Sequence, residues 1–232
     1  MFFSKFVSIA TVLVASGQAL PSLEDRQSGC PPIHIFGARE TTASPGFGTA
    51  GVFINLIVGA YPSATTEAIN YPATGGDSYG SSMRTGVANI ANQINSFNQR
   101  CPQAKLVVVG YSQGAQISDN AICGGGDPNQ GLTDTRALLT SAAGTAVKAI
   151  ILAGNPRNSP AEKSVFGYGS CNAQGFSPRP AGFSCSTFAA RIRSYCDAAD
   201  PYCCTGNDAA AHQAYGRIYG QNALAFVKSK LG

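Results

Sequence analysis

The stretch KLVVVGYSQGAQI at residues 105–117 decides the fold of this chain. Residues 106–109 form an unbroken run of leucine and valine. Such a run is typical of a strand that is buried on both faces of a parallel sheet. Two glycines then enclose Ser112, and a stretch compatible with a helix follows. We therefore predict a strand over 105–110, a tight turn at Ser112 and a helix over 113–122.

The turn itself has the pattern Gly110-Tyr111-Ser112-Gln113-Gly114, which is G-x-S-x-G between a strand and a helix. This is the context of a nucleophile elbow. Glycines flank the serine because side chains there would collide across the turn. The serine Oγ then projects from the carboxyl end of the sheet, and the N–H of Gln113 points to where an oxyanion would form. The motif therefore predicts a serine nucleophile for acyl transfer.

Strands and helices are expected to alternate along the rest of the chain. We predict strands at 33–36, 65–71, 147–153 and 189–196 and helices at 84–100 and 223–230. This alternation predicts an α/β fold, a three-layer sandwich with a mostly parallel central sheet. No internal repeat or long linker divides it.

The composition excludes several classes of protein. Of the 232 residues 44% are apolar and 12% are charged, which argues against a disordered chain. The net charge of +4 comes from 16 basic and 12 acidic residues spread without runs, unlike a nucleic-acid-binding surface. The body of the chain has no apolar stretch long enough to span a bilayer. We expect a monomer with no nucleic-acid or membrane partner.

The N-terminus has the features of a targeting segment. Residues 1–19 combine Lys5, an apolar core and small residues at the end, which predicts a secretory signal peptide. Residues 20–26 are expected to be a pro-segment, and 27–232 a single catalytic domain. The predicted location is therefore extracellular.

The cysteine content fits an oxidising compartment. The chain has eight cysteines and two histidines, and in a secreted protein eight cysteines predict four disulfides. Because no pair of C-x-x-C motifs is present, we expect no zinc site. No metal or organic cofactor is needed for the chemistry predicted at Ser112.

A serine nucleophile needs a base, and the two histidines are the candidates. In hydrolases with this elbow the chain order is serine, acid, histidine. His212 follows Ser112 and fits this order, whereas His34 lies in the first predicted strand and is expected to be a hydrogen-bonded structural residue.

Three aspartates lie at suitable positions for the acid that orients the base. They are Asp197, Asp200 and Asp208. A disulfide between Cys196 and Cys203 would hold Asp200 in a rigid loop, as an orienting carboxylate requires. Spacing alone favours Asp200 only modestly over Asp197.

Six segments together resemble a known family. They are HIFGARETT at 34–42, VVVGYSQGAQI at 107–117, CGGGDPNQG at 123–131, RPAGFSC at 179–185, YCDAADPYCC at 195–204 and HQAYG at 212–216. The chain resembles the cutinase-like family of secreted fungal esterases, and within it the acetylxylan esterases of carbohydrate esterase family five. The resemblance implies a small, disulfide-stapled α/β-hydrolase fold. It selects Asp200 as the acid and implies Thr41 as a second oxyanion donor beside Gln113.

The resemblance also implies the disulfide pairing. The expected pairs are Cys30–Cys101, Cys123–Cys185, Cys171–Cys204 and Cys196–Cys203. One departure is Asn155, because close relatives commonly have Gly-Asp-Pro where this chain has Gly-Asn-Pro.

The expected activity is removal of acetyl groups from acetylated xylan or its oligosaccharides. The segment Thr205–Ala211 is small and polar, which favours a short acyl group over the long chains of cutin. Tyr111, Tyr202 and Asn207 are candidate sugar contacts. The alternatives are a cutinase and, more distantly, a non-catalytic wall-binding protein on an esterase fold.

Overall fold

The structure is a computed structural model that describes residues 29–232. The predicted signal peptide and pro-segment lie outside the described residues. Within residues 29–232, no helix has both the length and the apolar character needed to cross a bilayer.

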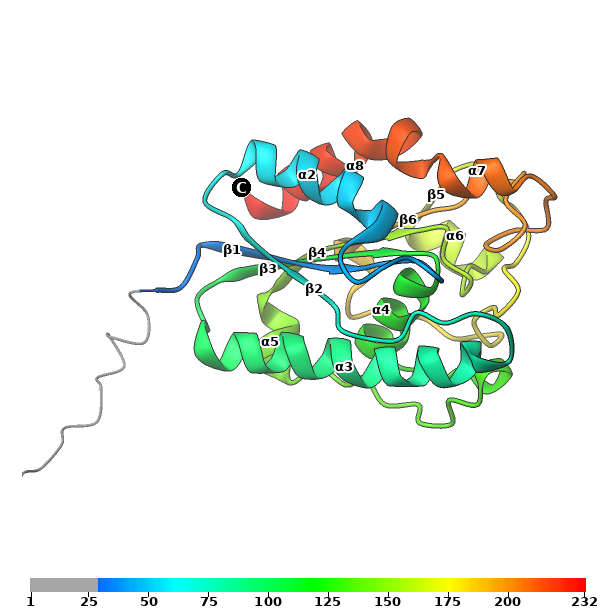
Figure 1. Ribbon diagram of the computed structural model, residues 1–232, viewed down its shortest axis with the longest axis horizontal. Coiled ribbons are helices and arrows are strands. Elements are labelled where there is room, and N and C mark those ends of the chain that lie inside the picture. Colours follow the sequence, from blue (N-terminus) through cyan, green and yellow to red (C-terminus); the bar gives the residue numbers. More distant parts are fainter. Residues whose placement is uncertain (1–28) are drawn as a thin grey trace, which may run out of the picture.

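A six-stranded sheet forms the centre of the molecule, and every strand pairing in it is parallel (Figure 1). Its order is β2-β1-β3-β4-β6-β5. The strands are β1 (Ile33–Ala38), β2 (Thr65–Ala68), β3 (Lys105–Tyr111), β4 (Val147–Ala153), β5 (Gly167–Tyr168) and β6 (Ile192–Tyr195). In a parallel sheet all carboxyl ends lie at one edge, so the loops after β1, β3 and β6 meet there.

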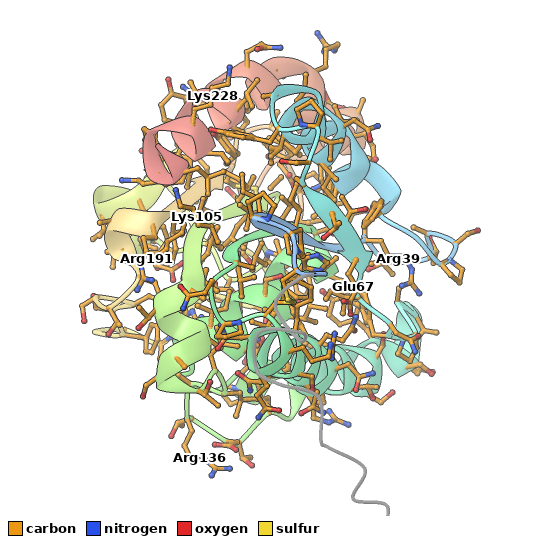
Figure 2. All side chains as sticks on the ribbon, turned by 90° about the vertical axis from the view of Figure 1, so that its left-hand side faces the viewer. Arg39, Glu67, Lys105, Arg136, Arg191 and Lys228 are labelled. Carbon is orange, nitrogen blue, oxygen red and sulfur yellow. A yellow bond between two sulfur atoms is a disulfide. The ribbon has the colours of Figure 1, made fainter. Side chains whose placement is uncertain are left out.

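Helices cover both faces of the sheet, as the predicted sandwich requires. Figure 1 shows α2 and α8 on one face and α3, α4 and α5 on the other. The helices are α2 (Gly51–Ala60), α3 (Tyr79–Arg100), α4 (Gln113–Cys123), α5 (Ser141–Ala146), α6 (Pro160–Phe166), α7 (Ala209–Gln213) and α8 (Tyr215–Leu231). The charged side chains are dispersed, with Lys228 and Arg136 at opposite ends of the molecule (Figure 2).

Alternation along β3 builds two hydrophobic cores. Leu106 and Val108 pack with α3, α4 and α5, whereas Val107 and Val109 pack with α2 and α8. All four side chains are fully buried, and full burial of one such side chain contributes about 1.5–3 kcal/mol. The unbroken apolar run is therefore explained by two covered faces, as predicted.

Several element boundaries differ from the sequence-based ones. The helix predicted at 84–100 begins five residues earlier, and the helix predicted at 223–230 begins at Tyr215. In the expected strand 189–196, a short 3-10 turn precedes β6. The strand predicted at 65–71 ends at Ala68. Ile69 N–H still donates to Gly37 O of β1, but the carbonyls of Ile69 and Tyr71 accept from the Arg39 side chain instead of a strand.

The four implied disulfides are present, and the described residues include no free cysteine. Cys196–Cys203 and Cys171–Cys204 both close on the loop after β6. That loop carries Asp200, so two covalent links restrain the backbone beside the candidate acid.

Candidate active site

A cleft of about 720 Å³ opens at the carboxyl edge of the sheet. Ser112 and His212 both line it, together with Thr41, Phe176 and Tyr202. These side chains come from the loops after β1 and β3, from the segment between β5 and β6, and from the segment between β6 and α8. Residues that are far apart in sequence are thus brought to one concave surface.

Ser112 occupies the strained turn that the motif predicts. Its φ is 54° and its ψ is −120°, a region that non-glycine residues rarely adopt. A Cβ on Gly110 would lie 2.5 Å from Gly114 O, which is the predicted collision across the turn. Gly114 has a different reason, because its Cβ would collide with the backbone carbonyl of Ala38 at the end of β1. The second glycine therefore admits the β1 loop to the elbow.

His212 and Asp200 form the expected hydrogen-bonded pair. His212 Nδ1 lies 2.6 Å from Asp200 Oδ2, and both side chains are buried. His212 sits in the short helix α7 rather than in an open loop. Gly154 packs against the imidazole so closely that a Cβ there would lie 2.6 Å from His212 Cε1. The imidazole is therefore held by the Asp200 carboxylate at Nδ1 and by the Gly154 backbone, which packs against the ring.

The other two aspartates have different partners. Asp197 Oδ1 accepts hydrogen bonds from Ser170 and from the hydroxyl of Tyr219. Asp208 caps α7, where its Oδ1 accepts from Ala210 N–H at 2.8 Å. The structure therefore brings Asp200, and neither alternative, to the imidazole.

The environment of Asp200 favours its ionised form. Burial by itself would raise the pKa of this carboxyl, but hydrogen bonds and charge from His212 and further hydrogen bonds from Tyr202 and Tyr215 hold the pKa below its ordinary value. An ionised carboxylate is what an orienting acid needs in order to stabilise an imidazolium.

His34 is a structural residue, as predicted. Its Nδ1 lies 2.6 Å from Thr65 Oγ1, and its ring stacks on Phe97 with centroids 3.8 Å apart. Burial lowers its pKa. The residue ties β1 to β2 and to α3, and it does not line the cleft.

The surroundings of Thr41 and Gln113 suit two converging donors. Gln113 is the first residue of α4, where a backbone N–H has no intrahelical acceptor. Its side chain is fixed by Ser82 Oγ at 2.9 Å and Thr74 O at 3.1 Å. Thr41 lines the cleft, and the neighbouring Thr42 N–H donates to Ala73 O at 2.7 Å. Their role as an oxyanion hole stays a prediction.

The sugar contact expected at Tyr111 is wrong, and the one expected at Asn207 stays a prediction. Tyr111 is fully buried, and its hydroxyl donates to the backbone oxygen of His212 at 2.6 Å. It lies on the same face of β3 as Val109 and contacts the backbone of the base His212. Asn207 is exposed but does not line the cleft. Tyr202 keeps its place, since it is 43% exposed and its ring centroid is 4.6 Å from that of His212.

Sequence reasoning missed an aromatic pair in the cleft wall. Tyr79 and Phe176 pack edge to face with centroids 5.5 Å apart, and both line the cleft. Phe176 is 45% exposed. For Phe176 the sequence shows only an isolated aromatic residue within a glycine-rich segment, and this pattern does not predict where the ring lies in the fold.

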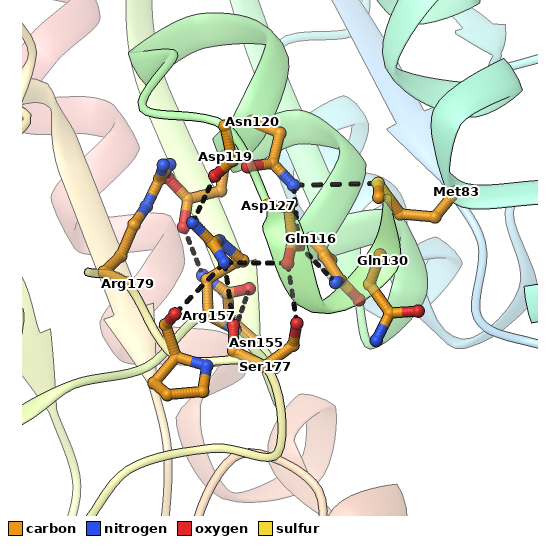
Figure 3. Close-up of polar contacts among 12 residues, drawn as sticks. Met83, Gln116, Asp119, Asn120, Asp127, Gln130, Asn155, Arg157, Ser177 and Arg179 are labelled. Atoms are coloured by element: carbon orange, nitrogen blue, oxygen red, sulfur yellow. Dashed lines mark hydrogen bonds and ion pairs between the residues drawn. The ribbon is translucent and has the colours of Figure 1, made fainter. Parts of the chain in front are cut away.

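A buried charged cluster supports this wall from behind (Figure 3). Arg157 pairs with Asp127 at 3.0 Å, and Arg179 pairs with Asp119. The cluster reaches the cleft because Ser177, the neighbour of Phe176, donates to Asp127 Oδ1 at 2.7 Å. It reaches the cleft a second time because Tyr79 donates to Gln116, whose amide donates to Asp127 at 2.7 Å.

Asn155 has a clear place in this cluster. Its Nδ2 donates to Asp119 Oδ2 at 2.8 Å, and its Oδ1 accepts from Arg157 N–H at 3.1 Å. A carboxylate at this position could not donate to Asp119. Burial and the charge of Asp119 already raise the pKa of nearby Glu162. Asparagine thus satisfies the cluster without adding a further buried carboxylate to Asp119, Asp127 and Glu162, which share only two arginines.

Comparisons with known proteins give the family. The cutinase family model matches residues 29–231. The chain belongs to the cutinase family. It is 54% identical to acetylxylan esterase 2 of Talaromyces purpureogenus, covering 99% of both chains, and 55% identical to cutinase 11 of Verticillium dahliae, covering 98% of this chain and 77% of the relative.

A solved structure of a family member agrees with the fold. The catalytic core of acetyl xylan esterase from Trichoderma reesei superposes with a TM-score of 0.83 at 54% identity, covering 87% of this chain and 99% of that one. Relatives at nearly equal identity are named for different esters. Overall identity therefore does not choose the substrate of this cutinase-family chain, and the cleft must be considered by itself.

Proposed function

We propose that this protein is a secreted serine esterase that removes acetyl groups from acetylated xylan. The observation that carries the proposal is the buried Asp200–His212 pair, joined at 2.6 Å, whose imidazole lines the same cleft as the strained Ser112. A nucleophile, a base and an orienting acid are the groups that acyl transfer needs. The solved and curated relatives named acetylxylan esterase support the choice of ester.

In the proposed reaction, Ser112 Oγ attacks the acetyl carbonyl while His212 takes its proton. Asp200 stabilises the imidazolium, and the N–H groups of Gln113 and Thr41 bind the oxyanion. His212 then protonates the departing sugar oxygen. Water, activated by His212, hydrolyses the acetyl-enzyme and releases acetate.

The cleft wall, rather than the segment Thr205–Ala211, is our basis for substrate choice. No residue of that segment lines the cleft, so its small side chains do not set the acyl length. The wall combines aromatic rings with the side chains of Gln130 and Gln213. Rings that pack on apolar sugar faces and amides that bind hydroxyls suit a polysaccharide better than a long acyl chain.

The test compares acetyl, butyryl and octanoyl esters of one alcohol, with acetylated xylan and cutin as polymers. We expect kcat/KM to be highest for the acetyl ester and acetate to be released from xylan. A rate that rises toward the octanoyl ester, with cutin hydrolysed and xylan untouched, would establish the cutinase alternative.

Phe176→Ala is expected to separate polymer binding from chemistry. Loss of an exposed ring that packs on a sugar should raise KM for acetylated xylo-oligosaccharides about ten-fold. The rate on a small acetyl ester should change less than about two-fold, because the ring packs on Tyr79, whereas the ring beside His212 is that of Tyr202. Tyr168→Ala is the control, since Tyr168 is 41% exposed but lies outside the cleft. Equal KM values for both variants would contradict a sugar-binding wall.

We also propose that residues 27–232 form the secreted, mature enzyme. Four disulfides support an oxidising compartment. The intact mass of the protein from a culture medium tests this, and a chain retained inside cells with Met1 still attached would contradict it.

A further inference from the structure

The carboxylate of Asp200 receives four hydrogen bonds. Oδ1 accepts from the backbone N–H groups of Tyr202 at 2.6 Å and Cys203 at 3.1 Å. Oδ2 accepts from His212 Nδ1 at 2.6 Å and from the hydroxyl of Tyr215 at 2.7 Å. The tyrosine hydroxyl thus shares one oxygen atom with the imidazole.

The surroundings of Tyr215 fix the direction of its proton. The N–H of Asp197 donates to the hydroxyl oxygen at 2.9 Å. Cys203 Sγ lies 3.3 Å away but is bonded to Cys196, so it has no proton to give. Tyr215 is fully buried, and burial together with the charge of Asp200 raises its pKa. The hydroxyl therefore stays protonated and donates to Asp200.

Tyr215 also lies beside the base. It begins α8 three residues after His212, and the two ring centroids are 6.3 Å apart in an edge-to-face arrangement. A Cβ on Gly154 would lie 3.2 Å from the Tyr215 ring as well as against the imidazole. Asp200, His212 and Tyr215 therefore pack together beside Gly154, the residue that follows β4.

We propose that Tyr215 is a positioning residue, whose hydroxyl holds Asp200 Oδ2 against the Nδ1–H of His212 and keeps the carboxylate a hydrogen-bond acceptor during the reaction. The proposal rests on the proposed esterase function of the same site. Two donors on one oxygen lower its basicity. The proton that leaves Ser112 Oγ then stays on the imidazole, and passes from Nε2 to the departing sugar oxygen instead of moving to Asp200.

Tyr215→Phe removes only the hydroxyl, and the chain offers a matched control. Tyr219 lies one turn further along α8, and its hydroxyl donates to Asp197 Oδ1 at 2.7 Å, without contact to Asp200. Each substitution removes a hydroxyl that donates to the loop after β6, and Tyr215→Phe also removes the acceptor of Asp197 N–H, so both should lower the melting temperature, Tyr215→Phe by more. A purely structural role would lower stability but leave the pH profile of both folded variants unchanged.

The pH profile of kcat on an acetyl ester distinguishes the two roles. We expect Tyr215→Phe to lower kcat about ten-fold with KM unchanged. We expect the acid limb to move up by about half a pH unit, because a more basic carboxylate makes the neighbouring imidazole easier to protonate. Tyr219→Phe should keep the wild-type profile. Both variants retain the other titratable groups that surround the pair: Glu40 after β1, Tyr111 on β3, and Asp197 and Tyr202 in the loop after β6.

Two further measurements keep the test decisive. Site-specific 3-fluorotyrosine at position 215 retains the ring and strengthens the donor, so the acid limb should move to lower pH. In an Asp200→Asn background, adding Tyr215→Phe should change kcat less than about two-fold, because the shared acceptor is gone. The proposal is overturned if the profiles of Tyr215→Phe and Tyr219→Phe coincide, or if the ten-fold loss persists in the Asp200→Asn background. Absence of ester hydrolysis by the wild type would instead reject the proposed function.

Discussion

Ser112→Ala is expected to lower kcat about a million-fold while leaving the fold intact. The serine side chain forms no capping hydrogen bond at the start of α4, so its removal takes no support from the helix. Neither serine nor alanine is branched at Cβ, so alanine tolerates the φ of 54° no worse than serine does. The loss is therefore expected in the chemistry alone. Initial rates on an acetyl ester and thermal unfolding of the same preparation measure both quantities.

A matched control is Ser186→Ala, at an exposed serine that lies outside the cleft. It should keep the wild-type rate. If folded Ser112→Ala retained activity within about a hundred-fold of the wild type, the elbow would not supply the nucleophile.

His212→Ala is expected to cost as much as loss of the serine, about a million-fold in kcat. Without the imidazole nothing takes the proton from Ser112, and Asp200 is left buried without its main partner. Because the serine and the histidine act as one unit, Ser112→Ala combined with His212→Ala should be no slower than either variant alone.

His34→Gln is the control for the base. It breaks the contacts of His34 with Thr65 and Phe97, so a lower melting temperature is expected. The folded protein should keep its activity, since His34 lies outside the cleft. A requirement for His34 together with tolerance of His212→Ala would overturn the assignment of the base.

The central elements were predictable from the sequence because each has a local signal. The run at 106–109 specifies a doubly covered strand, and Gly110 with Gly114 specifies the turn. Tyr111 was misjudged although its signal was present. Strand alternation places it on the face of Val107 and Val109, so its burial follows from parity along β3.

Other features have no local signal. Phe176 is placed at the cleft by its neighbour Ser177, which is hydrogen-bonded to both Arg157 and Asp127. These residues are distant in sequence, and Arg157 and Asp127 also form an ion pair. Asn207 does not line the cleft because the loop after β6 folds back on itself, with Gly206 N–H donating to Asp200 O. Long-range packing of this kind decides which members of a loop face a substrate, and no residue pattern records it.

Titration with a serine-reactive phosphonate ester, followed by mass spectrometry of peptides, tests the central claim most directly. A phosphonate mimics the tetrahedral intermediate and requires an activated serine beside an oxyanion site. The account predicts that a single phosphonate binds each chain, that it is attached to Ser112, and that esterase activity disappears in proportion to labelling. A protein that stays unlabelled, or that is labelled elsewhere while its activity disappears, would contradict it.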